Sequence, residues 1–392
     1  MKDPVTAVTG ITYDRESIEQ WLFISHNTTC PVSNQPLPPD SLLTPNHTLR
    51  RLIQSWCTQN AVHGIDRIPT PKPPLEKVHV RNLLRDLSLP MLQLATLRKL
   101  ELLVLEHERN RKFLIEAGLI EAMSQFIATC HKRAETSGLE EALSVLSYLR
   151  SSSNEAKRLV IQNDHIIDTL VWVLGQEIDS QAKSHALLVL KTIISKASSS
   201  SLERLKLEFF EKIVGVITQK RVSHQGINAA LHVMLDTCPW GRNRLMMVEA
   251  GAVTVMVELE LESPEKRTTE LILGILFHLC SCADGRAQLV GHAAGIAVVT
   301  KRLLRVSPAA DDRALLIIAL ICKYTSNPAV IQEMLRVGTV TKLCMVLQVE
   351  CAAYLKEKAK EVLRTHSNVW KKSPCVEVST LLSRCSRIYF HR

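Results

Sequence analysis

A chain of 392 residues is too long for one hydrophobic core, so two folded units are the first expectation. Hydrophobic residues make up 46% of the chain and aromatic residues only 4%, with 14 glycines, which is typical of helices built from Leu, Val, Ile and Ala. The net charge of +9 is spread along the chain, so charge alone does not indicate a nucleic-acid-binding or membrane-binding protein.

Cysteine usage and the start of the chain bear on location. The 11 cysteines are scattered without a Cys-x-x-Cys pair, which indicates reduced, mostly buried thiols. No apolar run follows the initial Met-Lys-Asp-Pro, and no stretch approaches the roughly 18 apolar residues of a membrane-spanning helix. We therefore expect no secretory signal and a cytoplasmic location, with the nucleus as a second compartment.

The first sixty residues contain an ordered series of short motifs. In chain order they are Asp3-Pro4-Val5, Gly10-Ile11-Thr12-Tyr13-Asp14-Arg15, Trp21, Cys30-Pro31-Val32 and Pro45-Asn46-His47-Thr48-Leu49-Arg50-Arg51-Leu52-Ile53. A helix is expected from about Asp14 to Phe23, and Pro45-Asn46 predicts the capped start of another helix. The series resembles a U-box, the zinc-free relative of the RING finger of ubiquitin ligases.

This resemblance implies a chemistry without a nucleophile of the protein's own. A U-box binds a ubiquitin-conjugating enzyme that carries ubiquitin as a thioester, and it positions the thioester toward a substrate lysine. The implied function is a ubiquitin transferase that acts without a covalent intermediate, so no catalytic residue is expected in this chain.

The resemblance also assigns residues to conjugating-enzyme binding. It places Trp21 and Ile18 on one helix and Pro31 in the second loop at the contact surface, and it aligns Asn34 with a position where some relatives bridge ubiquitin and its carrier through a basic residue. An uncharged Asn makes that bridge weaker. From spacing alone, Trp21 fits a core aromatic equally well, and Pro31 fits a turn former.

In the family, ion pairs and hydrogen bonds replace zinc as the framework. The candidates for this network are Asp14, Arg15, Asn46, Thr48 and Arg50. The alternative is a zinc site made by His26, Cys30, His47 and Cys57. Their spacings match no structural zinc pattern, so we expect no metal and no other cofactor.

A proline-rich stretch divides the chain. Prolines at positions 69, 71, 73 and 74 exclude a regular helix and favour a stiff, extended spacer. We therefore expect a U-box over residues 1–66, a linker over residues 67–76, a helical array over residues 77–372 and a C-terminal tail over residues 373–392.

The array repeats a motif. Asn110-Arg111 precedes Glu116-Ala117-Gly118 with the same spacing by which Asn243-Arg244 precedes Glu249-Ala250-Gly251. Helices are expected after each glycine, from Leu119 to Ile127 and from Ala252 to Leu261, and related starts occur near His165, Phe210, Ala294 and Gly338. Steps of roughly 41 to 47 residues are the period of armadillo or HEAT repeats. The predicted fold class is mainly α, with a small α+β U-box followed by an α-solenoid.

Further helices and loops are expected between these starts. The helix-period runs are Leu139 to Leu149, Ser184 to Ile194, Gly226 to Leu235, Thr269 to Leu279 and Ala314 to Tyr324. Ser198 to Ser201 and Ser307-Pro308 are expected to be loops between helices.

The second half of the chain adds a more particular resemblance. It rests on four segments, which are Thr237-Cys238-Pro239-Trp240-Gly241-Arg242-Asn243-Arg244, Cys282-Ala283-Asp284-Gly285-Arg286-Ala287, Lys356-Glu357-Lys358-Ala359-Lys360 and Trp370-Lys371-Lys372-Ser373-Pro374-Cys375. These segments are similar to plant U-box/armadillo ligases of a subgroup linked to stress and defence. The resemblance implies that the array holds a protein substrate, with the third helices of the middle repeats as its surface, and that the chain also forms a homodimer, as some U-boxes do.

One element of the family pattern is not found. A Cys-Pro-hydrophobic loop normally precedes the Asp-Pro-Val strand, and Met1 stands where that loop ends, so we expect an incomplete U-box that lacks its first loop. Losing one central apolar anchor costs on the order of 2 kcal/mol, roughly thirtyfold in affinity. The alternative function is therefore a non-catalytic armadillo binding or adaptor protein.

Three basic clusters and three tryptophans leave other functions to consider. Solvated helix ends explain the clusters Arg242-Arg244, Lys301-Arg302-Arg305 and Lys371-Lys372, and the functional alternatives are an acidic substrate segment or a phosphoinositide-bearing membrane surface. Nuclear import adaptors resemble one another in a regular ladder of Trp and Asn along the concave face of the array. Trp172, Trp240 and Trp370 form no such ladder, so an import adaptor is not expected. Without stacked aromatics, no nucleic-acid partner is expected.

Overall fold

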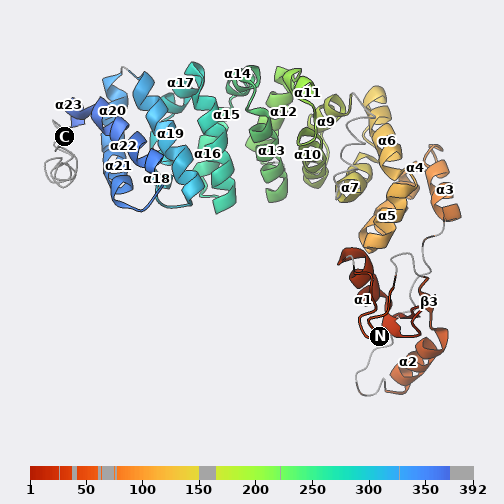
Figure 1. Ribbon diagram of the computed structural model, residues 1–392. Helices are drawn as coiled ribbons and strands as arrows, with labels where there is room; N and C mark the ends of the chain where they lie inside the picture. Colours follow the sequence, from red (N-terminus) through yellow and green to blue (C-terminus); the bar gives the residue numbers. More distant parts are fainter. Residues whose placement is uncertain are drawn as a thin grey trace. The chain divides into compact units, whose positions relative to one another are not determined.

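The chain forms two compact units. The computed structural model describes residues 1–25, 27–37, 42–60, 63, 75, 77–149, 165–220, 222–325 and 327–370. The first unit is Met1–Glu76 and the second is Lys77–Arg392, coloured in sequence order in Figure 1. Apart from Leu75, the predicted linker over residues 67–76 lies outside the described residues, and so does the whole predicted tail over residues 373–392.

The first unit is built on a small antiparallel sheet. Strands β1 (Pro4–Thr6), β2 (Thr12–Asp14) and β3 (Thr44–Pro45) have the order β2-β1-β3, so β1 is central. Val5 pairs with Tyr13 on one side and with Pro45 on the other. The turn between β1 and β2 closes through the Gly10 N–H, which donates to the Ala7 carbonyl at 2.9 Å, and its left-handed φ of +77° favours glycine.

Three helical segments complete this unit. Helix α1 (Arg15–Glu19) continues into a π-helical turn, η1 (Gln20–Ile24), and helix α2 (His47–Gln59) follows β3. The Asn46 side chain accepts a hydrogen bond from the Leu49 N–H at 2.9 Å, which confirms the predicted N-cap. The apolar core is small, and its fully or nearly buried members are Val5, Ala7, Ile18, Leu22, Cys30 and Leu37.

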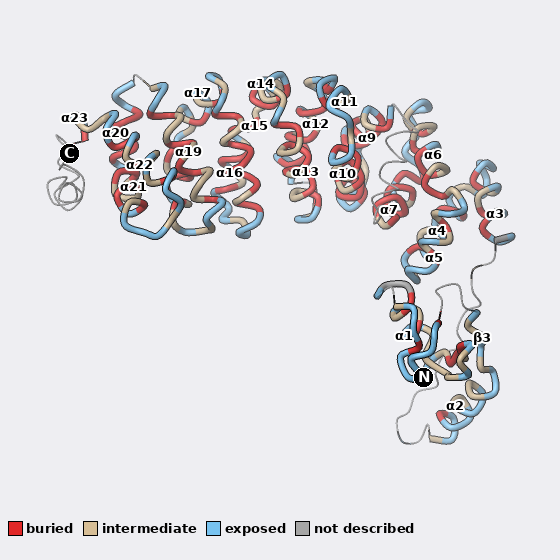
Figure 2. The backbone as a smooth tube through the Cα atoms, viewed as in Figure 1, coloured by how far each residue is buried: buried red, intermediate tan, exposed pale blue. Residues whose placement is uncertain are grey.

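The second unit is a solenoid of stacked helical repeats. Its long third helices pack against one another in succession and are α4 (Gln93–Glu106), α7 (Leu139–Leu149), α10 (Ser180–Ile194), α13 (His224–Thr237), α16 (Lys266–Cys280), α19 (Pro308–Tyr324) and α22 (Ala353–Thr365). Figure 2 shows buried segments in the helices from one end of this array to the other. Each repeat thus buries its apolar face against its neighbours.

The other helices form the remaining layers of the repeats. They are α3 (Lys77–Asp86), α5 (Glu108–Glu116), α6 (Leu119–Arg133), α9 (Ile166–Leu174), α11 (Ser199–Glu203), α12 (Leu207–Thr218), α14 (Gly241–Glu249), α15 (Ala252–Leu261), α17 (Ala283–Gly291), α18 (Gly295–Arg302), α20 (Pro328–Arg336), α21 (Thr339–Gln348) and α23 (Ser367–Trp370). Gly118, Gly251 and Gly338 precede α6, α15 and α21 with φ between +78° and +87°. These repeated glycines therefore supply a left-handed turn between the first and second helices of their repeats.

The Asn-Arg motif joins consecutive helices through carbonyl groups. Asn243 is fully buried, and its Nδ2 donates to Leu202 O at 3.0 Å and to Thr237 O at 3.2 Å. The Arg244 guanidinium donates to Cys238 O at 2.9 Å, just beyond the end of α13. Carbonyls at a helix C-terminus have no partner within the helix, so the motif satisfies them with side chains.

The predicted helices of the array are confirmed, whereas two predicted loops are wrong. Ser199–Glu203 forms the short helix α11, with Ser198 as its N-cap. Pro308 is the first residue of α19, because proline lacks only an N–H that the first helical turn leaves unbonded, and Ser307 caps it by accepting from Ala310 N–H at 3.2 Å.

The helices of the array are short relative to a membrane span. Among the described residues no single helix is long and apolar enough to cross a membrane. Helices α5 and α6 together have the length and composition of a span, but the chain bends by 74° between them.

Candidate functional site

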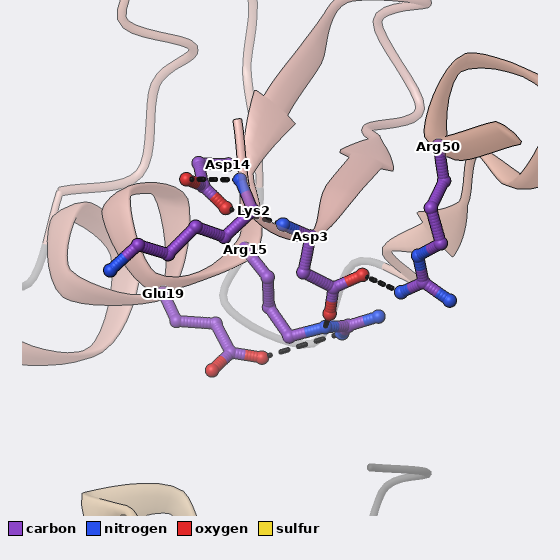
Figure 3. Close-up of polar contacts among 6 residues, drawn as sticks. All are labelled: Lys2, Asp3, Asp14, Arg15, Glu19 and Arg50. Carbon is purple, nitrogen blue, oxygen red and sulfur yellow. Dashed lines mark hydrogen bonds and ion pairs between the residues drawn. The ribbon is translucent and has the colours of Figure 1, made fainter. Parts of the chain in front are cut away.

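A carboxylate joins three segments of the N-terminal unit. Asp3 Oδ2 accepts a hydrogen bond from Arg15 Nε at 2.7 Å, and its Oδ1 accepts one from Arg50 Nη2 (Figure 3). Arg15 Nη1 also lies 3.5 Å from Glu19 Oε1. The side chains of Asp3, Arg15 and Arg50 are only 15–21% exposed, so these ion pairs are partly shielded from water. They fix β1, α1 and α2 to one another.

Asp14 holds the end of β2 against the start of β1. Its carboxylate accepts the backbone N–H of Lys2 at 3.0 Å and of Asp3 at 2.9 Å (Figure 3). Burial by itself would raise the pKa of Asp14, but the N–H donors outweigh it and hold the pKa below its usual value. The predicted framework roles of Asp14, Arg15 and Arg50 match these contacts.

Asn46 links the cap of α2 to the sheet. Its Nδ2 donates to Thr6 Oγ1 at 3.3 Å and to Thr12 Oγ1 at 3.4 Å. Thr48, by contrast, is exposed and makes no side-chain hydrogen bond with the described residues, so its predicted place in the network is wrong. As the second residue of α2 it lies on the solvent side of the helix, while the preceding Asn46 faces the sheet.

Cys30 is held by three hydrogen bonds to its sulfur atom. Its buried Sγ lies 2.8 Å from Tyr13 Oη, 3.4 Å from the Ser33 N–H and 3.6 Å from Thr9 Oγ1. Burial would raise the pKa of Cys30, but these donors lower it from 9.0 to about 6. Burial and the bond to Cys30 raise the pKa of Tyr13 to about 12. Both shifts favour a contact in which the tyrosine O–H donates to the cysteine sulfur.

A second polar contact fastens the helix to the loop. Trp21 Nε1 donates to Thr29 O at 2.7 Å, and its ring is partly exposed while packing against the small core. The loop itself closes through Cys30 N–H to Gln35 O at 2.8 Å. At its tip Pro31 is exposed and Val32 is 68% exposed. Trp21, Pro31 and Val32 thus form an apolar surface on a framework fixed by hydrogen bonds, which we call the loop face.

Ile18 does not belong to the loop face. Its side chain is only 1% exposed and lies in the core with Val5 and Leu22, so the prediction that it contacts a partner is wrong. The helix changes from α to π geometry at Gln20, where the Ser25 N–H donates to Gln20 O at 3.0 Å. A wider turn rotates the later residues relative to Ile18, so an α-helical period does not give their directions.

Asn34 lies at the end of the same loop. It is exposed and has a left-handed φ of +54°, and its N–H donates to Cys30 O at 3.0 Å. Asn tolerates this conformation better than most residues, so Asn34 closes the turn. Its predicted bridging contact with ubiquitin stays a prediction. Val32 was missed as a site residue because a single exposed valine has no periodic signal.

Comparisons with known proteins agree with this architecture. The model for the U-box domain matches residues 1–62, and the model for the plant U-box protein ARM repeat region matches residues 79–386. The chain belongs to the plant U-box family with armadillo repeats. Among its Arabidopsis thaliana relatives, the E3 ubiquitin-protein ligase PUB24 is 41% identical over 97% of this chain and 92% of the relative. The ligase PUB23 is 41% identical over 98% of this chain and 93% of the relative.

Solved structures support the solenoid fold alone. A structure from a study of the cadherin and beta-catenin interaction superposes with a TM-score of 0.62 at 12% identity, covering 82% of this chain and 58% of that one. An engineered protein superposes with a TM-score of 0.54 at 19% identity, covering 73% of this chain and 68% of the engineered one. With the curated relatives matched over nearly their whole length, this U-box/armadillo protein is an E3 ubiquitin-protein ligase of the PUB22, PUB23 and PUB24 type. A ubiquitin-conjugating enzyme is therefore a partner.

Proposed function

We propose that the conjugating enzyme docks on the loop face of Trp21, Pro31 and Val32, and that the armadillo array holds the protein substrate. The observation that carries the first half is the 2.7 Å bond from Trp21 Nε1 to Thr29 O. It fixes a partly exposed aromatic ring beside an exposed Pro-Val tip, and preorganised apolar anchors of this kind dominate protein interfaces.

The loop face acts by position rather than by covalent chemistry. Ubiquitin arrives as a thioester on the conjugating enzyme, and the substrate lysine attacks that thioester. The U-box raises the population of the reactive arrangement by binding it better than other arrangements. The Asp3 and Cys30 networks contribute by keeping the helix and the loop in fixed geometry.

The decisive experiment compares two exposed aliphatic residues of the same unit. Val32→Asp is expected to abolish measurable docking, because it buries a charge in the contact, whereas Leu42→Asp should have little effect, because Leu42, at 78% exposed, lies outside the loop face. Trp21→Ala should weaken docking about thirtyfold, equal to about 2 kcal/mol. Affinity for a broadly acting conjugating enzyme and the rate of ubiquitin discharge are the measurements. Equal losses in the Val32 and Leu42 variants would contradict this surface.

Two further partner proposals remain to be tested. For substrate, the third helices of the middle repeats supply a continuous row of packed helices, and stacked rows of this kind form extended binding surfaces. For a homodimer, Leu52 and Trp56 on α2 are 63% and 55% exposed and lie four residues apart on one helix face. Light scattering of Trp56→Ala against the wild type tests that contact. The cytoplasmic location and the stress and defence role stay predictions.

A further inference from the structure

Arginine occupies the fourth position of three first helices in the array. These residues are Arg111 in α5, Arg244 in α14 and Arg286 in α17. Each guanidinium donates to carbonyls near the end of the preceding third helix. Arg111 Nε reaches Val104 O at 2.8 Å, and Nη1 of Arg286 reaches Cys280 O at 2.9 Å, as Arg244 does at Cys238. The three arginines therefore share one structural role.

Their charges are neutralised differently. Arg111 Nη1 lies 3.0 Å from Glu108 Oε2, three residues earlier on the same helix. The corresponding first positions of α14 and α17 are Gly241 and Ala283, which carry no charge. Across the described ranges, neither Arg244 nor Arg286 forms an ion pair with a carboxylate, and both use Nη1 for their carbonyl bonds. Nε of Arg244 is buried without a hydrogen-bond partner among the described residues, so Nη2 is the donor that Arg244 has left for a ligand.

A third arginine and several rings complete this cationic region. The Arg313 guanidinium, on α19, lies 5.0 Å from the centre of the Phe277 ring, and that of Arg286 lies 4.2 Å from the Tyr324 ring. Tyr324 is 57% exposed, so this stacked pair is open to a ligand. Within the described part of the chain, the ion-pair contact of Arg313 is a long one, 3.8 Å from its Nε to Asp312 Oδ2.

His278 reports the resulting electrostatic potential. Burial lowers the pKa of His278, and the positive charges of Arg313 and Arg244 lower it further. The charges of Arg313 and Arg244 therefore act on the last turn of α16, where His278 lies. An anion bound there would offset that charge and raise the pKa of the imidazole.

We propose that Arg244, Arg286 and Arg313, with the rings of His278 and Tyr324, bind an acidic segment of the protein substrate. This acidic-segment site rests on the proposed role of the array in holding substrate. Guanidinium groups recognise carboxylates through paired N–H donors. Arg244 and Arg286 hold the same position in two successive first helices, and Arg313 comes from the third helix α19.

The test uses the full chain without conjugating enzyme, so its result does not depend on docking at the loop face. A fluorescent peptide of alternating glutamate and serine is the probe, with a glutamine-for-glutamate peptide as the matched ligand. We expect salt-dependent binding of the glutamate peptide and little binding of the glutamine peptide. Arg313→Gln is the first variant, because Arg313 makes no carbonyl bond in the described structure and its loss leaves the helix ends intact.

Arg313→Gln and Arg286→Gln should each weaken the glutamate peptide about fivefold. Arg111→Gln is the matched control, since it removes the same cap but a charge that Glu108 already neutralises, and it should change binding less than about twofold. The His278 pKa, followed by NMR of labelled histidine, should rise when the peptide saturates the protein. Equal binding of both peptides, an equal effect of Arg111→Gln, an unchanged His278 pKa or tighter binding of a single-stranded oligonucleotide would overturn the proposal.

Discussion

The U-box and the armadillo array are stabilised by different kinds of interaction. Among its described residues the U-box has one core cluster of six buried residues, and it relies on ion pairs and hydrogen bonds centred on Asp3, Asp14, Asn46 and Cys30. The array relies on long helices whose apolar faces are buried by the next repeat, and its polar bonds mainly satisfy helix ends. A small unit depends on a few specific polar contacts, whereas a solenoid spreads its stability over many apolar ones.

The largest difference should come from a cavity in the array. Phe210 is fully buried on α12, with Phe209 edge-to-face at 5.0 Å. Phe210→Ala should lower the free energy of unfolding of the array by about 3 to 5 kcal/mol, because the cavity it leaves is only partly refilled. Thermal unfolding followed by circular dichroism measures this, with Leu261→Ala, 49% exposed, as the control. A matching loss in the control would argue against a dense core there.

The next effect concerns the U-box alone. Asp3→Ala leaves Arg15 and Arg50 without their shared carboxylate, so we expect a loss of about 3 kcal/mol, while the array keeps its transition. Hydrogen exchange of the amides in β1 and α2 measures it separately from the array. Lys2→Ala, which removes an exposed side chain, is the control. Unchanged exchange in the Asp3 variant would mean that the small core suffices.

A smaller difference is expected between two copies of one motif. Asn243 donates to two carbonyls, whereas Asn110 donates to one, Leu103 O, at 3.2 Å. We expect a loss of about 2 kcal/mol for Asn243→Ala and about 1 kcal/mol for Asn110→Ala, because more carbonyls lose their donor in the first. Urea unfolding of both variants checks the order, and the reverse order would refute the explanation.

The smallest effect is a change in pH dependence. The pKa of Cys30 is about 6 in the folded U-box against an ordinary 9.0, so its contribution to stability is present above pH 9 and is lost as pH falls through about 6. Tyr13→Phe removes one donor to the sulfur and should raise the pKa of Cys30, reducing that dependence. NMR titration of labelled cysteine and urea unfolding at both ends of this range are the measurements. An unchanged cysteine pKa would show that Tyr13 does not stabilise the thiolate.

Periodic features were predictable from sequence. The repeated glycines predicted the starts of α6, α15 and α21, and Pro45-Asn46 predicted the cap of α2. Both features were predictable because a helix start depends on residues that are close together in the chain. The Asn-Arg motif was found as a repeat, but its role was not, since the bonds of Asn243 run to a carbonyl 41 residues away.

Contacts between distant segments were not predictable. Asp3 was missed as the centre of the ion-pair network because its partner Arg50 is 47 residues away. Ile18 was assigned to the contact surface from the family resemblance together with Trp21, but it lies in α1 with its side chain in the core, and the chain changes to a π-helix only at Gln20. Exposure likewise separates Thr48 from Asn46, although only His47 lies between them in the sequence. Local patterns give elements, while three-dimensional contacts decide the role of each residue.

The central position of β1 has a consequence for synthesis on the ribosome. The strand made first pairs on both edges, and its second partner, β3, follows about 40 residues later, which is about 2 to 8 s at usual translation rates. During that interval one edge of β1 has no strand to pair with, and the Asp3 carboxylate has Arg15 but not yet Arg50. The contacts that complete the sheet and the Asp3 network therefore become available only after the chain has been made as far as β3 and α2.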